Sequence, residues 1–142
     1  MFKNFFKKQK IDNLKSNNIL IFALLIHAAK ADENYTDTEK KIIIKAIMNL
    51  NKININEAEK LLKLAETKEE ESNQIVEFTK EIKKYSMDFR LKIIEIIWKI
   101  VYSDSTSDSY ESNLIRRICG LLYISDKDNG IIKMKVQNLL KK

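Results

Sequence analysis

An acidic turn that occurs twice, 72 residues apart, constrains the fold of this chain more than any other feature. The first copy covers residues 31–39 (ADENYTDTE) and the second covers residues 103–111 (SDSTSDSYE). In each copy an Asp is followed seven residues later by a Glu, and apolar stretches flank both turns at the same offset. Self-similarity at a fixed offset predicts two copies of one helix-turn-helix unit within a single fold.

The composition favours helices throughout. The 142-residue chain has no proline and only two glycines, the residues on which turn-rich sheet folds depend. Apolar residues also recur at helical spacing, as in Ile42, Ile43, Ala46, Ile47 and Leu50, which share one face. We therefore expect one all-α domain of this length.

Periodicity and capping signals place the helix ends. Thr36 with Glu39, and Asp108 with Glu111, have the form of a capping box, in which a short polar side chain and a Glu three residues later satisfy free backbone N–H groups. Weaker start signals begin at Asn56, Ser86 and Ser125, and the run 69–71 (EEE) is expected to open a helix, where carboxylates face the positive end of the dipole. Seven helices are predicted at about 11–31, 37–51, 57–66, 69–84, 87–103, 109–122 and 126–140.

The charge distribution argues against a nucleic-acid-binding protein. The net charge is +6, but residues 1–15 and 133–142 each contribute +4, so the body between them carries −2. No basic stripe with interleaved aromatic residues is present, and we expect no nucleic-acid partner.

Residues 1–17 are expected to form a basic, aromatic N-terminal arm, and residues 18–142 the helical domain. Phe2, Phe5 and Phe6 with the neighbouring lysines favour at most weak peripheral contact with a membrane; the alternative is an arm that folds onto the domain or stays disordered. The longest apolar run, Ile19 to Ile26, is far shorter than the ~20 residues of a membrane span. With no secretory signal and a single cysteine, we expect a cytoplasmic protein.

Several residues together resemble the TerB family of tellurite-resistance-associated proteins. They are the first turn with its preceding 29–32 (AKAD), the segment 56–59 (NEAE), Phe78-Thr79, Arg90, Trp98, the second turn, and 114–118 (LIRRI). The similarity covers roughly residues 18–140 and extends to the N-terminal part of the DjlA co-chaperones.

The resemblance implies an all-α, seven-helix cytoplasmic domain that is not a known enzyme. It also implies work beside a membrane protein and calcium-binding stress proteins, with metal at the acidic turns. The family commonly has Gly after the first Asp of the turn, where this chain has Glu33 and Ser105, and Thr36 replaces an Asp. A metal site here would carry less negative charge than the family pattern.

Two interpretations of the acidic turns remain open. The turns together could offer hard carboxylate oxygens to calcium or magnesium. Alternatively, the Asp side chains bond to backbone N–H groups of their own turns and both Glu side chains close capping boxes, with no ligand. The candidate metal ligands are Asp32, Glu39, Asp104, Asp108 and Glu111.

Nothing in the sequence amounts to a catalytic constellation. His27 is the only histidine and Cys119 the only cysteine, and both lie in apolar helical stretches, so we expect packed side chains and no enzyme. The favoured hypothesis is a binding and scaffold module of the stress-response type, with protein partners and a divalent cation at the paired turns. The alternative is a co-chaperone-type accessory domain that recognises partner helices through an apolar groove.

Overall fold

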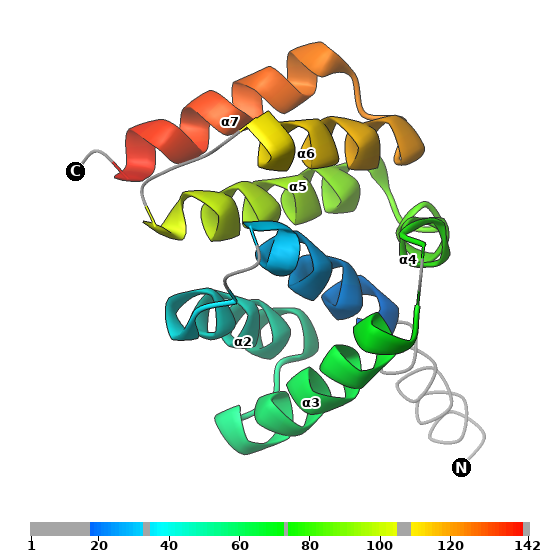
Figure 1. The fold of residues 1–142 in the computed structure, drawn as a ribbon, viewed down its shortest axis with the longest axis vertical. Coiled ribbons are helices and arrows are strands. Elements are labelled where there is room, and N and C mark those ends of the chain that lie inside the picture. The colour runs from blue at the N-terminus through cyan, green and yellow to red at the C-terminus, as the bar shows by residue number, and fades with distance from the viewer. Residues whose placement is uncertain (1–17, 33–34, 73, 105–108, 141–142) are drawn as a thin grey trace.

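The computed structural model describes residues 18–32, 35–72, 74–104 and 109–140, and every regular element in these ranges is helical (Figure 1). The side chains of residues 32, 104 and 109–111 lie outside the description. A first helix covers residues 18–29. It is followed by η1 (Lys30–Asp32), α2 (Asp37–Asn51), α3 (Ile55–Glu71), α4 (Val76–Ile82), α5 (Met87–Val101), η2 (Tyr102–Asp104), α6 (Ser109–Leu121) and α7 (Asp126–Leu140). The all-α, seven-helix prediction is confirmed.

The first helix forms the centre of the molecule. Its six consecutive residues from Ile21 to Ile26 are all fully buried, so this helix is apolar on every side and needs cover all round. The cover comes from helices on several sides, with α2 and α3 on one side and α5 with α6 on the other (Figure 1). None of the described helices combines the length and the apolar character that crossing a membrane requires.

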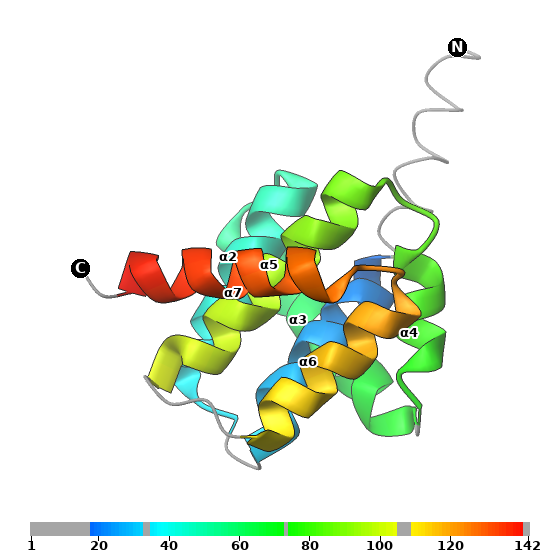
Figure 2. The same cartoon turned by 90° about the horizontal axis from the view of Figure 1, so that it is seen from above.

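Helix α5 is the second organising element because it packs against both α2 and α7. Its residues Ile93, Ile94, Ile97 and Trp98 are buried in the core. Seen from above, α7 crosses over α5 and projects toward the C-terminus (Figure 2). The core therefore lies around the first helix and α5, and α7 covers α5 from outside.

The element bounds repeat with the offset seen in the sequence. The 3-10 turn η1 ends at Asp32 and η2 ends at Asp104, 72 residues later; α2 begins at Asp37 and α6 at Ser109, again 72 residues later. Each unit thus consists of a helix, a 3-10 turn and a second helix. Superposition of the two units stays a prediction.

The structure corrects the sequence prediction between residues 52 and 84. The helix predicted at 57–66 is α3 and runs on to Glu71, so the run 69–71 closes a helix and does not open one. Its cap is Asn54, whose side chain accepts a bond from the Glu57 N–H (2.9 Å), and not Asn56. Caps at Ser86 and Ser125 are confirmed by bonds to the N–H groups of Phe89 and Asp128.

Candidate functional site: an apolar groove and the first acidic turn

A groove of about 450 Å³ lies between α2, α5 and α7. Its lining comes from one face of each helix: Thr38, Ile42, Lys45, Ala46, Asn49 and Leu50 of α2; Lys92, Glu95, Ile96, Lys99 and the following Ser103 of α5; Val136, Leu139 and Leu140 of α7. We call it the α2/α5/α7 groove. Apolar side chains from all three helices line it, together with three lysines and one glutamate.

Polar contacts join α7 to α5 and the following η2, beside the apolar packing of Val136 and Ile132. The Trp98 indole N–H donates to Asn129 Oδ1 (2.9 Å), Gln137 Nε2 donates to the Tyr102 hydroxyl (2.8 Å), and a further ion pair joins the two helices. Val136 is the fully covered apolar residue of α7. In contrast, four large apolar side chains of α7 are more than half exposed: Ile131 (57%), Met134 (63%), Leu139 (52%) and Leu140 (54%).

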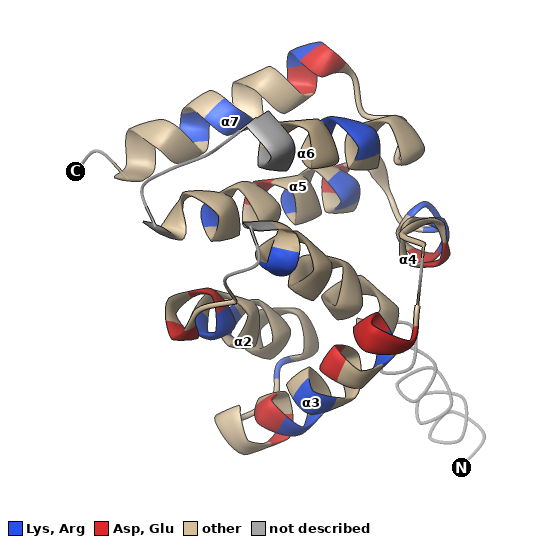
Figure 3. Ribbon diagram, viewed as in Figure 1, with Lys and Arg blue, Asp and Glu red and all other residues tan. Residues whose placement is uncertain are grey.

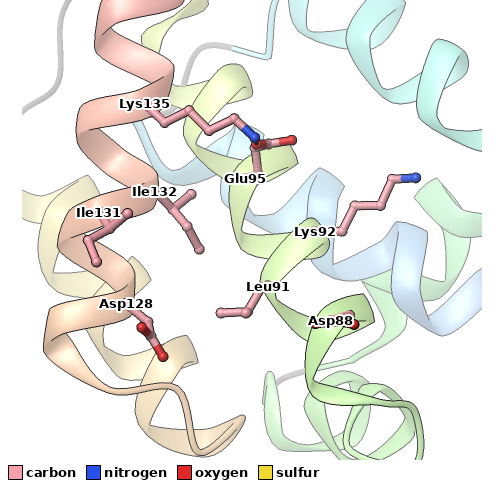
Figure 4. A pocket seen from close by; sticks show the side chains of 8 residues that line it. All are labelled: Asp88, Leu91, Lys92, Glu95, Asp128, Ile131, Ile132 and Lys135. Atoms are coloured by element: carbon pink, nitrogen blue, oxygen red, sulfur yellow. The ribbon is translucent and has the colours of Figure 1, made fainter.

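A second hollow of about 390 Å³ shares Lys92 and Glu95 with the groove, and the ion pair between Glu95 and Lys135 (2.6 Å) lies in its lining (Figure 4). In this view Ile131 and Ile132 of α7 face the hollow, and Lys92 points away from α7. The hydrogen bond from Lys135 lowers the pKa of the Glu95 carboxyl below its usual value, since it stabilises the charged form. Glu95 is therefore held as an anion between two lysines, with Lys99 Nζ at 3.8 Å.

At the first acidic turn the predicted capping box is present. The Thr36 hydroxyl oxygen accepts from the Glu39 N–H (3.1 Å), and Glu39 Oε1 accepts from the Thr36 N–H (2.7 Å) and hydroxyl (3.0 Å). Glu39 is only 4% exposed. Of the five candidate ligands, this carboxylate is thus engaged in closing the N-terminus of α2, as the capping interpretation predicts.

The other four candidates, Asp32, Asp104, Asp108 and Glu111, fall outside the described side chains, so their coordination stays a prediction. What the structure shows is that η1, which ends at Asp32, packs against α6, the helix that begins after the second turn. Among the side chains that are described, no three His, Cys, Asp or Glu residues form a group that could hold a metal ion.

Charged residues surround the first turn. Burial, followed by the charge of Glu66 and other nearby carboxylates, raises the pKa of the Tyr35 hydroxyl far above its usual value. Lys40 lies over the Tyr35 ring with its Nζ 4.8 Å from the centroid, and Lys30 lies at 5.8 Å. Acidic residues also concentrate at the nearby C-terminal end of α3 (Figure 3).

His27 lies at the rim of the core, not at a catalytic centre. Its Nδ1 is 3.3 Å from Glu69 Oε1, and Lys30 Nζ donates to the other oxygen of Glu69 (2.9 Å). This three-residue contact ties the first helix and η1 to the C-terminal turn of α3, and it explains why α3 continues past Lys68. Carboxylates are unfavourable at a helix C-terminus, but two basic groups stabilise Glu69 here.

The expectation for Cys119 can also be compared with the structure. Cys119 is 1% exposed, and burial raises the pKa of its thiol to about 12, so it is the packed apolar residue that the sequence predicted. Arg116 and Arg117 are both exposed. Arg90 has a role that sequence reasoning missed: its guanidinium donates to the carbonyls of Lys83, Tyr85 and Leu122, joining the ends of α4 and α6 to α5.

The groove residues were predicted only as parts of apolar stripes. Ile132, Val136, Leu139 and Leu140 fall at helical spacing in the sequence and form one such stripe, but in the structure its last two residues are exposed. A signal was present in the sequence, because Ile131 and Met134 lie off this stripe and give α7 more apolar surface than one neighbouring helix can cover.

The model of one known protein family matches most of this chain. A family model described as tellurite resistance protein TerB matches residues 18–134, which is well over half of the chain, and the chain therefore belongs to the TerB family. Comparison with curated proteins and with solved structures gave no match.

Proposed function

We propose that this member of the TerB family is a non-enzymatic binding and scaffold module of the stress-response type, which docks protein partners in the α2/α5/α7 groove. The observation that carries the proposal is the groove itself, flanked by the exposed Leu139 and Leu140. Apolar patches rimmed by polar residues mark interaction sites, because leaving them in water is unfavourable. A partner helix is the natural occupant of a groove between helices.

The chemistry of the described residues supports binding over catalysis. Cys119 is buried with a raised thiol pKa, which makes it a poor nucleophile. The contact described for His27 is with the carboxylate of Glu69, which Lys30 also engages, and not with a nucleophile. The TerB family is also not known as an enzyme family. We place the module in the cytoplasm, with membrane-associated stress proteins among its candidate partners.

Site-specific photo-crosslinking in cells tests this function. A photoreactive amino acid replaces Leu139 in the groove or, as a matched control, Leu64 on α3; the two side chains are 52% and 54% exposed. We expect a discrete crosslinked protein from position 139 and none from position 64. Absence of a crosslink at 139, or the same products at both positions, would contradict docking in the groove.

A second candidate function is binding of a divalent cation at the paired acidic turns. The packing of η1 against α6 favours it, since this contact brings elements of the two repeat units together at one end of the molecule (Figure 2). Calcium is the first candidate because the ligands would be carboxylate oxygens. Calcium-dependent thermal stability is the test of this proposal.

A further inference from the structure

Resting on the proposed docking function, we infer that the α2/α5/α7 groove selects one class of partner: an amphipathic helix whose apolar face is flanked by acidic residues. The inference follows from the length, the shape and the charge of the groove.

The length of the groove matches a short helix. On α2 the lining runs from Thr38 to Leu50, and on α5 with its 3-10 extension it runs from Lys92 to Ser103. At a rise of 1.5 Å per residue these spans are about 18 and 16 Å, or roughly three helical turns. Both walls are helix faces, so side chains of a partner helix can alternate with those of α2 and α5 as in ordinary helix packing.

The shape of the groove decides how deeply a partner enters. Three helices line the groove of about 450 Å³, and the exposed Leu139 and Leu140 show that it is open to solvent. A helix that lies in such an open groove inserts one row of side chains, at positions i, i+3 or i+4, and i+7, while its opposite face stays in water. The partner must be amphipathic.

The charge of the groove decides which amphipathic helix fits. Three lysines, Lys45, Lys92 and Lys99, line the groove against one glutamate. That glutamate, Glu95, already pairs with Lys135 (2.6 Å) and with Lys99 (3.8 Å). Among the described residues no ion pair engages Lys45 or Lys92, and both are exposed. The groove therefore presents uncompensated positive charge beside its apolar side chains, which attracts acidic and repels basic partners.

The same charge argues against occupants from the chain itself. Residues 1–15 contain three phenylalanines but also five lysines and one aspartate. A second copy of the chain would bring the lysines of its own α7, Lys133 and Lys135, against this groove. Either occupant would place like charges together, whereas glutamates flanking the apolar face of a partner would pair with the lysines on both walls.

The spacing of two lysines on α5 predicts the spacing of the acidic residues on the partner helix. Lys92 and Lys99 are seven residues apart, which is two helical turns or about 10.5 Å. A partner helix that runs along α5 meets both lysines when its acidic residues are also seven positions apart. The probe is therefore an 18-residue helical peptide, by design about as long as the groove plus one turn at each end. It has leucines on one face and glutamates seven positions apart on the flank.

The test uses the full chain and fluorescence anisotropy of labelled peptides at about 150 mM salt, where long-range attraction is screened. Three peptides are compared: the acidic probe, a version with lysine for each glutamate, and a version that keeps the glutamates but has serine for each leucine. The third peptide controls for attraction to the net charge of +6. We expect saturable binding of the acidic probe alone.

Matched variants locate the binding. The substitutions Lys45→Glu and Lys92→Glu together should weaken binding about tenfold, whereas Lys60→Glu with Lys63→Glu, the same charge change on the exposed face of α3, should not. Leu139→Gln should weaken binding and Leu64→Gln should not. Melting curves verify that all four proteins are folded.

The outcomes separate the inference from the proposed function. If the lysine-containing peptide binds as tightly as the acidic probe, the partner class is wrong while docking in the groove stands. If both lysine pairs respond alike, the lysines of the groove do not select the partner and the inference is overturned. If none of the peptides binds, the inference is overturned, and the crosslinking result from position 139 alone decides whether the groove docks a partner.

Discussion

Replacing Glu39 by alanine should destabilise the protein by about 2 kcal/mol. The carboxylate accepts two hydrogen bonds from Thr36, at 2.7 and 3.0 Å, and is 4% exposed. A hydrogen bond to a charged group contributes roughly 1.5–3 kcal/mol, and removal of a capping side chain costs roughly 0.5–2 kcal/mol. The two bonds share one acceptor atom and Thr36 is partly exposed to water, so the total stays near the middle of these ranges.

Urea unfolding followed by circular dichroism and by the fluorescence of Trp98, the only tryptophan, measures this change. In a thermal scan the same loss lowers Tm by about 6 °C, at roughly 3 °C per kcal/mol for a domain of this size. Glu39→Gln keeps an acceptor oxygen but no charge, so its effect should fall between those of wild type and alanine.

Asp37→Ala is the matched control. Asp37 lies in the same helical turn but is exposed, so it acts on α2 only through the helix dipole, worth about 0.3–1 kcal/mol. If Glu39→Ala destabilises the protein no more than Asp37→Ala does, the capping box does not hold the first turn, and the reasoning about Glu39 fails.

Three further predictions follow from the structure. Because burial raises the Cys119 pKa to about 12, this thiol should not react with a disulfide reagent at pH 8 until the protein unfolds; fast reaction of the native protein would contradict its burial. The hydrogen bond from Lys135 lowers the pKa of Glu95 in the folded protein below its value in the unfolded chain. The ionised carboxylate therefore adds to the free energy of unfolding above the unfolded-state pKa, and this contribution is lost as the pH falls through the folded-state pKa. Glu95→Gln should make the free energy of unfolding less dependent on pH in this range, as urea unfolding between pH 3 and 6 would measure. If the paired turns bind calcium with an affinity near 10⁻³ M, about 10 mM calcium should stabilise wild type by about 1.4 kcal/mol relative to chelator, and Asp32→Asn with Asp104→Asn should lose this gain; equal melting shifts would leave the turns as helix caps.

Local signals in the sequence were sufficient for most helices. The predicted starts of α2, α5, α6 and α7 agree with the structure, because a polar residue lies at or directly before each start and an apolar stripe follows it. The failure at α3 has two causes. Asn54 and Asn56 compete as caps, and only the structure decides between them; and the contact of Glu69 with His27 and Lys30, 42 and 39 residues away in sequence, extends the helix.

The candidate site was less predictable than the fold. The capping box at Thr36 and Glu39 is local and was predicted correctly, since both partners lie within one helical turn. The groove is not local: its walls come from three helices, and whether Leu139 is covered depends on how far α7 projects beyond α5. An apolar stripe shows which face of a helix avoids water but not which neighbour covers it.

Mapping the bound peptide by NMR tests the central claim most directly. In an ¹⁵N-labelled protein titrated with the acidic probe, amide shifts should concentrate in α2 between residues 38 and 50, in α5 between 92 and 103, and in the last turn of α7, while α3 and α4 stay unchanged. Shifts centred on α3 and α4, or on residues 31–39 alone, would contradict the assignment of the α2/α5/α7 groove as the docking site.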